Sequence, residues 1–440
     1  MYLIDAFRTI EPITLACVGS GGKTTAIFQL ARQLKPPVIV SSSTHLACDQ
    51  LSQADQHLLI ETSEQVRRLF NTLEPKIYLL TGEKIPGNKV CGPSYAILDE
   101  INTFSQVNKV PFLIEADGSR QRPLKAPSDN EPAIPGWCNV VMVCTGLQGV
   151  GKPLSADFVH RPEQFSKLIG KMRDEEVTLD DLGNVMCTRL GGLKNIPSHA
   201  MKIALLNQAD DFKTQSEAGK LARRLSKDYD SIVIASLKKE KQIHAIYERV
   251  GAIILAAGSS SRFGEPKQLL RWRGKPLVWH VSKAALRAGL DPVIVVLGDI
   301  IQPIKDELIN LNVHFVVNEN WQSGQSGSII AGLNSLPGCT GATVFLMADQ
   351  PLISVELLRS LVETHRSNLD PIVAPEIDSQ TTSPVLFDKC TFTTLKSLAG
   401  DFGGRTIFSR FAVTKLPWFN SQSCMDIDTP EDFQRLLSSK

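Results

Sequence analysis

The sequence lacks the features that mark secreted, membrane-spanning or nucleic-acid-binding proteins. Its Lys and Arg residues (47) nearly balance its Asp and Glu residues (46), so no basic field would draw the protein to nucleic acid. No apolar run approaches the roughly 18 residues that a membrane span needs. None of the nine cysteines forms a C-x-x-C pair, and the eight histidines are scattered. We therefore expect reduced thiols in a cytoplasmic protein, and no metal site built from protein ligands alone.

Short apolar runs alternate with helical patterns along all 440 residues, which is typical of α/β proteins with parallel sheets. The chain is too long for one ordinary core, so we expect more than one domain. The charged segment 237–250 is expected to be a linker or a last helix, and we predict domains at 1–247 and 248–440. Strands are predicted at 13–18, 37–42, 76–81, 111–116, 140–145, 202–207, 231–236, 251–257, 292–298, 313–318, 342–348 and 371–375.

Each half begins with a strand that leads into a glycine-rich loop, the place where open α/β sheets bind ligands. In the first half this loop reads GSGGKTT. A strict P-loop would need glycine where Cys17 stands, but a shortened loop can still turn its N–H groups and a helix N-terminus toward phosphate. The alternative is a plain turn that binds nothing. The predicted nucleotide-binding residues are Gly19, Gly21, Gly22, Lys23, Thr24 and Thr25.

Two acidic residues, Glu115 and Asp117, follow the strand at 111–116 within the run EADGSR. Acids at such a strand end hold the metal or its water in nucleotide-dependent enzymes, although they can also simply cap the strand. The runs GSGGKTT, EADGSR and LLNQAD together resemble the YqeC-type accessory proteins of selenium-dependent molybdenum hydroxylases, over residues 10–240. The resemblance implies a P-loop-like nucleotide-binding domain, with a molybdenum hydroxylase apoenzyme as a candidate partner.

The second loop, LAAGSSSRFGEPKQLL, fits neither the P-loop nor the dinucleotide fingerprint, because Arg262 and Lys267 come four and nine positions after Gly258. The pattern resembles the signature loop of nucleotidyltransferases that attach a nucleoside monophosphate to a phosphorylated acceptor. Further motifs follow in order, and with them the second half is similar to the MocA-type molybdenum cofactor cytidylyltransferases, which implies a Rossmann-like nucleotidyltransferase domain. These motifs lie at 318–333, 347–353, 381–387, 400–405 and 426–433.

The resemblance implies a role for several residues of the second half. Arg262 and Lys267 would neutralise the leaving pyrophosphate, and Asp349 would bind Mg²⁺ as the third catalytic residue. Asp428, or else Asp426, would supply a second carboxylate, although Asp428 can also cap the following helix. Residues 381–387 would form a wall for the pterin acceptor. The expected nucleotide contacts are Leu255, Ala256, Ala257, Gly258, Gly324 and Ser326, the last two at a helix start that is otherwise only a capping loop.

These motifs leave the nucleotide and the kind of activity open. Ala257 narrows the space beside the base and favours CTP over GTP, but a single methyl group discriminates by only about 1–3 kcal/mol. The first hypothesis is transfer of CMP from CTP to a molybdopterin-type cofactor. The second is a nucleotide-dependent carrier or maturation factor with little turnover. A third is a nucleotidyltransferase that acts on a sugar phosphate.

Overall fold

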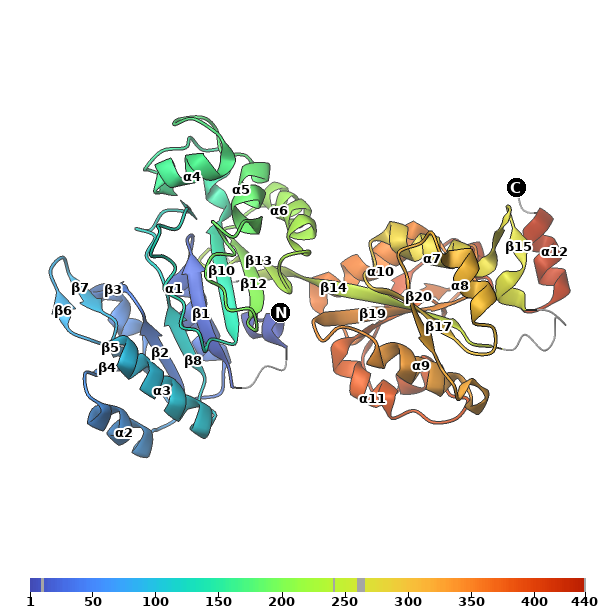
Figure 1. The fold of residues 1–440 in the computed structure, drawn as a ribbon, viewed down its shortest axis with the longest axis horizontal. Helices are drawn as coiled ribbons and strands as arrows, with labels where there is room; N and C mark the ends of the chain where they lie inside the picture. Colours follow the sequence, from blue (N-terminus) through green and yellow to red (C-terminus); the bar gives the residue numbers. More distant parts are fainter. Residues whose placement is uncertain (9–11, 240–241, 259–265, 439–440) are drawn as a thin grey trace. The chain divides into compact units, whose positions relative to one another are not determined.

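The computed structural model describes residues 1–8, 12–239, 242–258 and 266–438 of the chain. The chain divides into two compact units, Met1–Tyr247 and Glu248–Lys440 (Figure 1). Within the described ranges, no helix is both long enough and apolar enough to cross a membrane.

The first unit contains a parallel sheet with its strands in the order β13-β12-β10-β1-β8-β2-β5-β4. Its inner strands are buried along almost their whole length, as expected for a parallel sheet covered on both faces. The strands are β1 (Thr14–Gly19), β2 (Val38–Ser42), β4 (Gln56–Leu59), β5 (Ile77–Thr81), β8 (Phe112–Glu115), β10 (Val140–Gly146), β12 (Met201–Asn207) and β13 (Ser231–Ser236).

Helices flank this sheet. The helix that follows the first glycine-rich loop packs against β1, β2 and β8, which fixes the loop at the centre of the sheet. The helices are α1 (Lys23–Gln33), α2 (Ser63–Asn71), α3 (Tyr95–Asn108), α4 (Pro162–Ile169), α5 (Leu179–Cys187) and α6 (Phe212–Leu225). Two small sheets complete the unit, formed by β3 (His45–Ala47), β6 (Lys84–Ile85) and β7 (Lys89–Cys91), and by β9 (Leu124–Lys125) and β11 (Val159–His160).

The second unit is built on a mixed sheet. Strands β18, β17, β14 and β19 are parallel, and β22 then joins β19 in the antiparallel direction. β20 pairs with β22, β21 and β23 beyond it. The first strand, β14 (Gln242–Ala256), belongs to this unit from Glu248 onward. The other strands are β17 (Val293–Leu297), β18 (His314–Val317), β19 (Thr340–Met347), β20 (Ile372–Ile377), β21 (Gln380–Thr381), β22 (Val385–Asp388) and β23 (Val413–Pro417), with a short hairpin of β15 (Arg271–Trp272) and β16 (Lys275–Pro276).

The strand period of two divides the core of this unit between the two faces of the sheet. Ala252, Ile254 and Ala256 face one hydrophobic cluster, whereas Ile253 and Leu255 face the other. Figure 1 shows the sheet nearly edge-on, with α7, α8 and α10 on one side and α9 and α11 on the other. The helices are α7 (Leu277–Ala288), α8 (Gln302–Leu308), α9 (Gln325–Asn334), α10 (Val355–Asn368), α11 (Phe392–Lys396) and α12 (Pro430–Ser438).

All the predicted strands are present, which confirms the α/β class. The expectation of a linker or helix at 237–250 is wrong, because residues from 242 onward form the start of β14. Ile243, Tyr247 and Val250 are buried in this strand. Such β-branched and aromatic side chains pack well on a pleated surface, and this packing outweighs the helical character of the neighbouring charged residues.

Candidate active site

The candidate site of the second unit begins where β14 ends. β14 lies between β17 and β19, and all three strands run in the same direction. Their carboxyl ends therefore share one edge of the sheet, where α/β proteins bind ligands. The glycine-rich loop leaves β14 at this edge, and the buried Gln268 side chain donates a hydrogen bond to the Gly258 carbonyl (2.7 Å). Arg262 lies outside the described residues.

Lys267 and Asp349 meet at the same edge. Asp349 follows β19, whereas Lys267 begins a short 3-10 helix, Lys267–Leu269, and the two side chains form an ion pair. The Lys267 ammonium also donates to Asp428 (2.9 Å), which precedes α12. Burial alone would lower the pKa of Lys267, but the charges of Asp349 and Asp428 outweigh it and raise the pKa above its usual range. Lys267 is therefore a permanent cation between two carboxylates.

The carboxylates around Lys267 have different surroundings. Asp349 is 7% exposed, and its Oδ1 atom is buried without a hydrogen-bond partner among the described residues. Asp426 instead accepts a hydrogen bond from the Gln350 side chain (2.8 Å), and burial together with the nearby charge of Asp349 raises its pKa. An unpartnered buried carboxylate oxygen is costly unless a cation or a donor joins it. Asp349 therefore fits a metal ligand.

The helix cap that the sequence offered as an alternative role for Asp428 is formed by its neighbour. Thr429 Oγ1 accepts from the Asp432 N–H (3.2 Å), and the Asp432 carboxylate accepts from the Thr429 N–H (2.9 Å). This reciprocal pair satisfies the first turn of α12. The Asp428 carboxylate is thus left to face Lys267.

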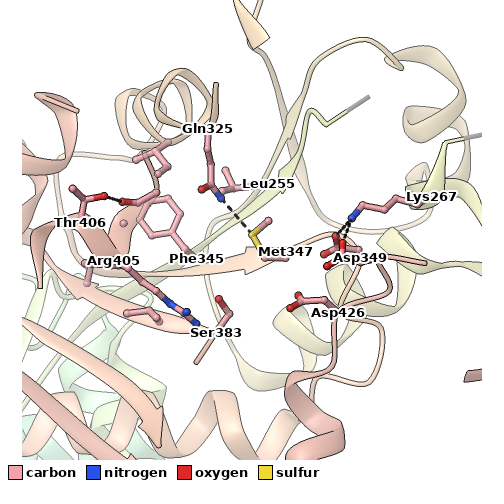
Figure 2. A pocket seen from close by; sticks show the side chains of 16 residues that line it. Leu255, Lys267, Gln325, Phe345, Met347, Asp349, Ser383, Arg405, Thr406 and Asp426 are labelled. Atoms are coloured by element: carbon pink, nitrogen blue, oxygen red, sulfur yellow. Dashed lines mark hydrogen bonds and ion pairs between the residues drawn. The ribbon is translucent and has the colours of Figure 1, made fainter. Parts of the chain in front are cut away.

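Two cavities meet at these residues. The loop lobe, about 490 Å³, adjoins the start of the glycine-rich loop, and the arginine lobe, about 510 Å³, adjoins β22 and Arg405. Leu255, Lys267, Gln325, Met347 and Asp349 line both lobes, so they form the boundary between them. In Figure 2, Arg405 and Thr406 lie on one side of the arginine lobe, and Lys267 and Asp349 lie on the opposite side. Two separate ligands can therefore approach Lys267 and Asp349 from different sides.

The start of α9 forms one wall of the loop lobe. Gly324 has a φ of 113°, and a side chain there would meet the Gly400 carbonyl at 2.5 Å, so only glycine fits. The Ser326 hydroxyl donates to that same carbonyl (2.6 Å) and does not line either lobe. Ser328, two residues further along α9, lines the loop lobe instead. Of the two residues expected at this helix start, Gly324 lines the loop lobe and Ser326 lines neither lobe.

The side chains of Ala256 and Ala257 point to opposite faces of the sheet, because successive side chains of a strand alternate. Ala257 lines the loop lobe, as do Leu255 and Gly258, whereas the Ala256 side chain lies in the hydrophobic core. Ser383 lines the arginine lobe, within the segment 381–387 expected to form a wall for the acceptor. Other lining residues were not singled out from the sequence, among them Gln268, Gln325, Asp401 and Arg405. All four stand within motifs quoted from the sequence, so their position in those motifs was an available signal.

In the first unit, the loop at 19–25 is held against the sheet. Gly21 has a φ of 74°, and a side chain there would meet the Gly146 backbone nitrogen at 2.2 Å. Asn207 donates to the Gly21 carbonyl (2.7 Å) and so ties the loop to the end of β12. Thr24 and Thr25 lie in the first turn of α1, where the helix N-terminus favours an anion.

Lys23, Glu115 and Asp117 come together beneath this loop. The Lys23 ammonium donates to the Gly19 carbonyl (2.8 Å) and lies 3.0 Å from Asp117 and 3.6 Å from Glu115. Burial alone would lower the pKa of Lys23, but the charges of Asp117 and Glu115 outweigh it and raise the pKa above its usual range, so Lys23 stays protonated. The Thr24 hydroxyl donates to Glu115 (2.8 Å), whereas Asp117 accepts from Lys125 (2.7 Å) and from the Gly19 N–H. Glu115 therefore contacts the Thr24 hydroxyl, whereas Asp117 holds the loop in place.

Within the described ranges, no group of three or more His, Cys, Asp or Glu residues is arranged to hold a metal ion. A divalent cation at Asp349 would thus depend on phosphate oxygens and water for most of its ligands, as Mg²⁺ commonly does in nucleotide sites.

Comparisons with known families agree with this division of the chain. Residues 252–415 match the MobA-like NTP transferase domain, and residues 15–163 match the YqeC protein family. The chain therefore carries a YqeC domain followed by a MobA-like nucleotidyltransferase domain.

Individual relatives cover each part almost completely. The uncharacterized protein YqeC of Escherichia coli is 26% identical over 55% of this chain and 94% of its own length. The nicotine blue oxidoreductase of Paenarthrobacter nicotinovorans is 28% identical over 43% of this chain and 96% of its own length. Among solved structures, Rv0371c from Mycobacterium tuberculosis is 27% identical, with a TM-score of 0.39, over 43% of this chain and 98% of its own.

Proposed function

We propose that the second unit transfers CMP from CTP to the terminal phosphate of molybdenum-loaded molybdopterin and releases pyrophosphate. The observation that carries this proposal is the position of Lys267 and Asp349 at the boundary between the two lobes. Each lobe, at about 500 Å³, falls within the range of small-molecule sites. A donor nucleotide in the loop lobe and an acceptor in the arginine lobe would place both phosphates next to this ion pair.

The reaction needs positioning and charge neutralisation more than proton transfer. An oxygen of the acceptor phosphate attacks the α-phosphorus of CTP and forms the new P–O bond, while the bond to the β-phosphate oxygen breaks and pyrophosphate leaves with the electron pair. The attacking phosphate is already anionic at neutral pH, so no strong base is required. Lys267 would neutralise charge on the phosphates in transit, and we propose Arg262, from the sequence alone, as a second cation for pyrophosphate.

We assign the metal to Asp349 and Asp428, with Asp426 as a further carboxylate in reach of the arginine lobe. The unpartnered Oδ1 atom of Asp349 supports this assignment. Mg²⁺ is the cation proposed, because it would draw negative charge from the triphosphate and combines with one or two carboxylates. Lys267 is paired with both of these carboxylates and would turn to the phosphates when the cation joins them.

CTP is proposed as the donor because Ala257 lines the loop lobe and its methyl group narrows the space for a base. Gly298 packs against Ala257, and a side chain at Gly298 would meet the Ala257 carbonyl at 2.6 Å, so the wall behind this methyl group is tight. A purine would fit less well than a pyrimidine. GTP, or another acceptor, is the alternative that the experiment below distinguishes.

For the first unit we propose a P-loop-like nucleotide site formed by Gly19, Gly21, Gly22, Lys23, Thr24 and Thr25. Its support is the loop braced between β1 and α1, with a lysine and two acids directly beneath it. The match to the YqeC family supports an accessory role in the maturation of a molybdenum hydroxylase, with the apoenzyme as partner.

The proposal is tested by incubating the protein with Mg²⁺, labelled CTP or GTP, and molybdenum-loaded molybdopterin, and then measuring labelled dinucleotide and pyrophosphate. Equal amounts of both products with CTP are expected. A carrier would retain the cofactor without releasing pyrophosphate. One relative bears an oxidoreductase name. Oxidation or reduction of the pterin without release of pyrophosphate would favour an oxidoreductase activity instead.

A further inference from the structure

The arginine lobe has an apolar floor and an uneven distribution of polar groups. Phe345, Phe387, Val385 and Ile329 line it with side chains that are all less than 9% exposed. The two phenylalanine rings pack edge to face, with centroids 5.4 Å apart. These apolar side chains can contact a ring, and the polar residues Gln325, Ser383 and Thr406 also line the lobe.

Arg405 supplies a cation far from the ion pair at the boundary. Among the residues that the structure describes, none is recorded in an ion pair or hydrogen bond with its guanidinium group. Figure 2 places Arg405 across the lobe from Lys267 and Asp349. A guanidinium group without a protein partner in a binding cavity has all its donors available to a ligand.

The local sequence explains why Arg405 reaches the cavity. It lies in a short 3-10 helix, Gly404–Ile407, directly after two glycines. A side chain at Gly404 would meet the Phe387 ring at 2.7 Å, and one at Gly403 would meet the Gln325 side chain at 2.5 Å. The missing side chains let this backbone lie directly on the floor of the lobe, which sets Arg405 at its rim.

We infer that Arg405 is a specificity residue that reads the distal edge of the acceptor bound in the arginine lobe. This inference rests on the proposed function and adds the part of the acceptor that is recognised. The phosphate would face Lys267 and Asp349, and the ring would lie against Phe345. The guanidinium group of Arg405 can donate two parallel hydrogen bonds to neighbouring atoms of the ring, such as a carbonyl oxygen and a ring nitrogen.

The test compares the full chain with Arg405→Met, Arg405→Lys and the control Arg410→Met, an exposed arginine that does not line the lobe. The probes are neopterin 3′-phosphate, followed by its own fluorescence, hexose 1-phosphate, and CTP with Mg²⁺. We expect Arg405→Met to weaken pterin binding roughly 10-fold or more, since a hydrogen-bonded charge is lost, and to change the CTP Kd less than about twofold. Arg405→Lys should give an intermediate loss because lysine keeps the charge but not the fork. Arg410→Met should match the wild type.

Three results would overturn the inference in different ways. Equal pterin affinity in wild type and Arg405→Met, with CMP transfer to molybdopterin intact, would show that Arg405 does not recognise the acceptor, while the proposed function would stand. Tighter binding of hexose phosphate than of the pterin would reject the acceptor class. Binding of CTP without either acceptor, and without transfer, would reject the proposed function and this inference together.

Discussion

The ammonium group of Lys267 and the carboxylate of Asp349 form an ion pair at the boundary between the loop lobe and the arginine lobe. Their side chains are 20% and 9% exposed, so solvent screens the pair only weakly. The pair joins a loop after β14 to the end of β19, two neighbouring parallel strands. A cation and a carboxylate held at this edge can act on the phosphates of two ligands at once.

Replacing Lys267 with methionine removes the cation and keeps much of the side-chain volume. We expect CMP transfer to fall by roughly two to three orders of magnitude, because charge on the pyrophosphate is then less well neutralised in the transition state. Steady-state rates with CTP and molybdopterin measure this loss. Lys275→Met, on the exposed β15–β16 hairpin, is the control and should retain normal rates. Normal transfer by Lys267→Met would exclude a catalytic role for Lys267.

Ala257→Gly tests the choice of nucleotide. Removing the methyl group from the wall of the loop lobe should lower the preference for CTP over GTP by about 5- to 150-fold, which corresponds to about 1–3 kcal/mol. The ratio of kcat/KM for the two nucleotides measures the change. Ala256→Gly is the matched comparison, since that methyl group lies in the core and the ratio should stay as in wild type. An unchanged ratio in Ala257→Gly would mean that the base lies elsewhere.

Lys23→Met tests whether the two loops work independently. Lys23 is only 3% exposed and pairs with Glu115 and Asp117 beneath the first loop. We expect nucleotide binding by the first unit to be lost. The rate of CMP transfer should stay within about twofold of wild type, because the second glycine-rich loop follows a strand of a different sheet region, in the second unit. Equilibrium binding and transfer assays on the same preparation measure both, with Lys35→Met as an exposed control. Parallel loss of both activities in a folded variant would contradict independence.

Glu131 gives a pH-dependent test of the first unit. Burial alone would raise the pKa of Glu131, but hydrogen bonds from Arg161 and Lys125 outweigh it and lower the pKa to about 2 from 4.5. A carboxyl group with a depressed pKa contributes stability that is complete above pH 4.5 and is lost as the pH falls toward 2. Glu131→Gln should therefore cost about 1–3 kcal/mol at pH 7, and the difference from wild type should shrink between about pH 5 and pH 2.

Urea unfolding followed by circular dichroism at several pH values measures this effect. Glu64→Gln is the control, because Glu64 pairs with Arg68 at 4.0 Å with both side chains more than 80% exposed. Such a surface pair should contribute no more than about 1 kcal/mol. A Glu131→Gln penalty that does not change with pH would show that the carboxyl group is not held ionised by its partners.

The sequence was sufficient to predict the strands and the position of the glycine-rich loops, because both depend on the local pattern of residues. The apolar runs at 13–18 and 342–348 correspond to β1 and β19, and the glycine-rich loop of each half follows a central strand. The region around 242 was not recognised as a strand, since its charged residues carry no clear alternation and its pairing is set by the sheet.

Contacts between distant segments could not be predicted in this way. Ser326 was expected near the nucleotide, but its hydroxyl donates to Gly400, a residue far along the chain. Glu115 and Asp117 looked equivalent in the sequence, and only the positions of Thr24 and Lys125 distinguish them. The surroundings of Arg405 likewise depend on β22 and α9, which meet it only in the folded chain.

The most direct test of the account is single-turnover CMP transfer by Asp349→Asn, measured beside molybdopterin binding. The asparagine keeps the shape of the side chain but is a poor ligand for a hard cation. Transfer should fall by about two to four orders of magnitude, or roughly 3–5 kcal/mol, while the Kd for molybdopterin changes little. Asp370→Asn, in the loop before β20 and outside both lobes, is the control. Near-normal transfer by Asp349→Asn would contradict a metal-assisted reaction at this site.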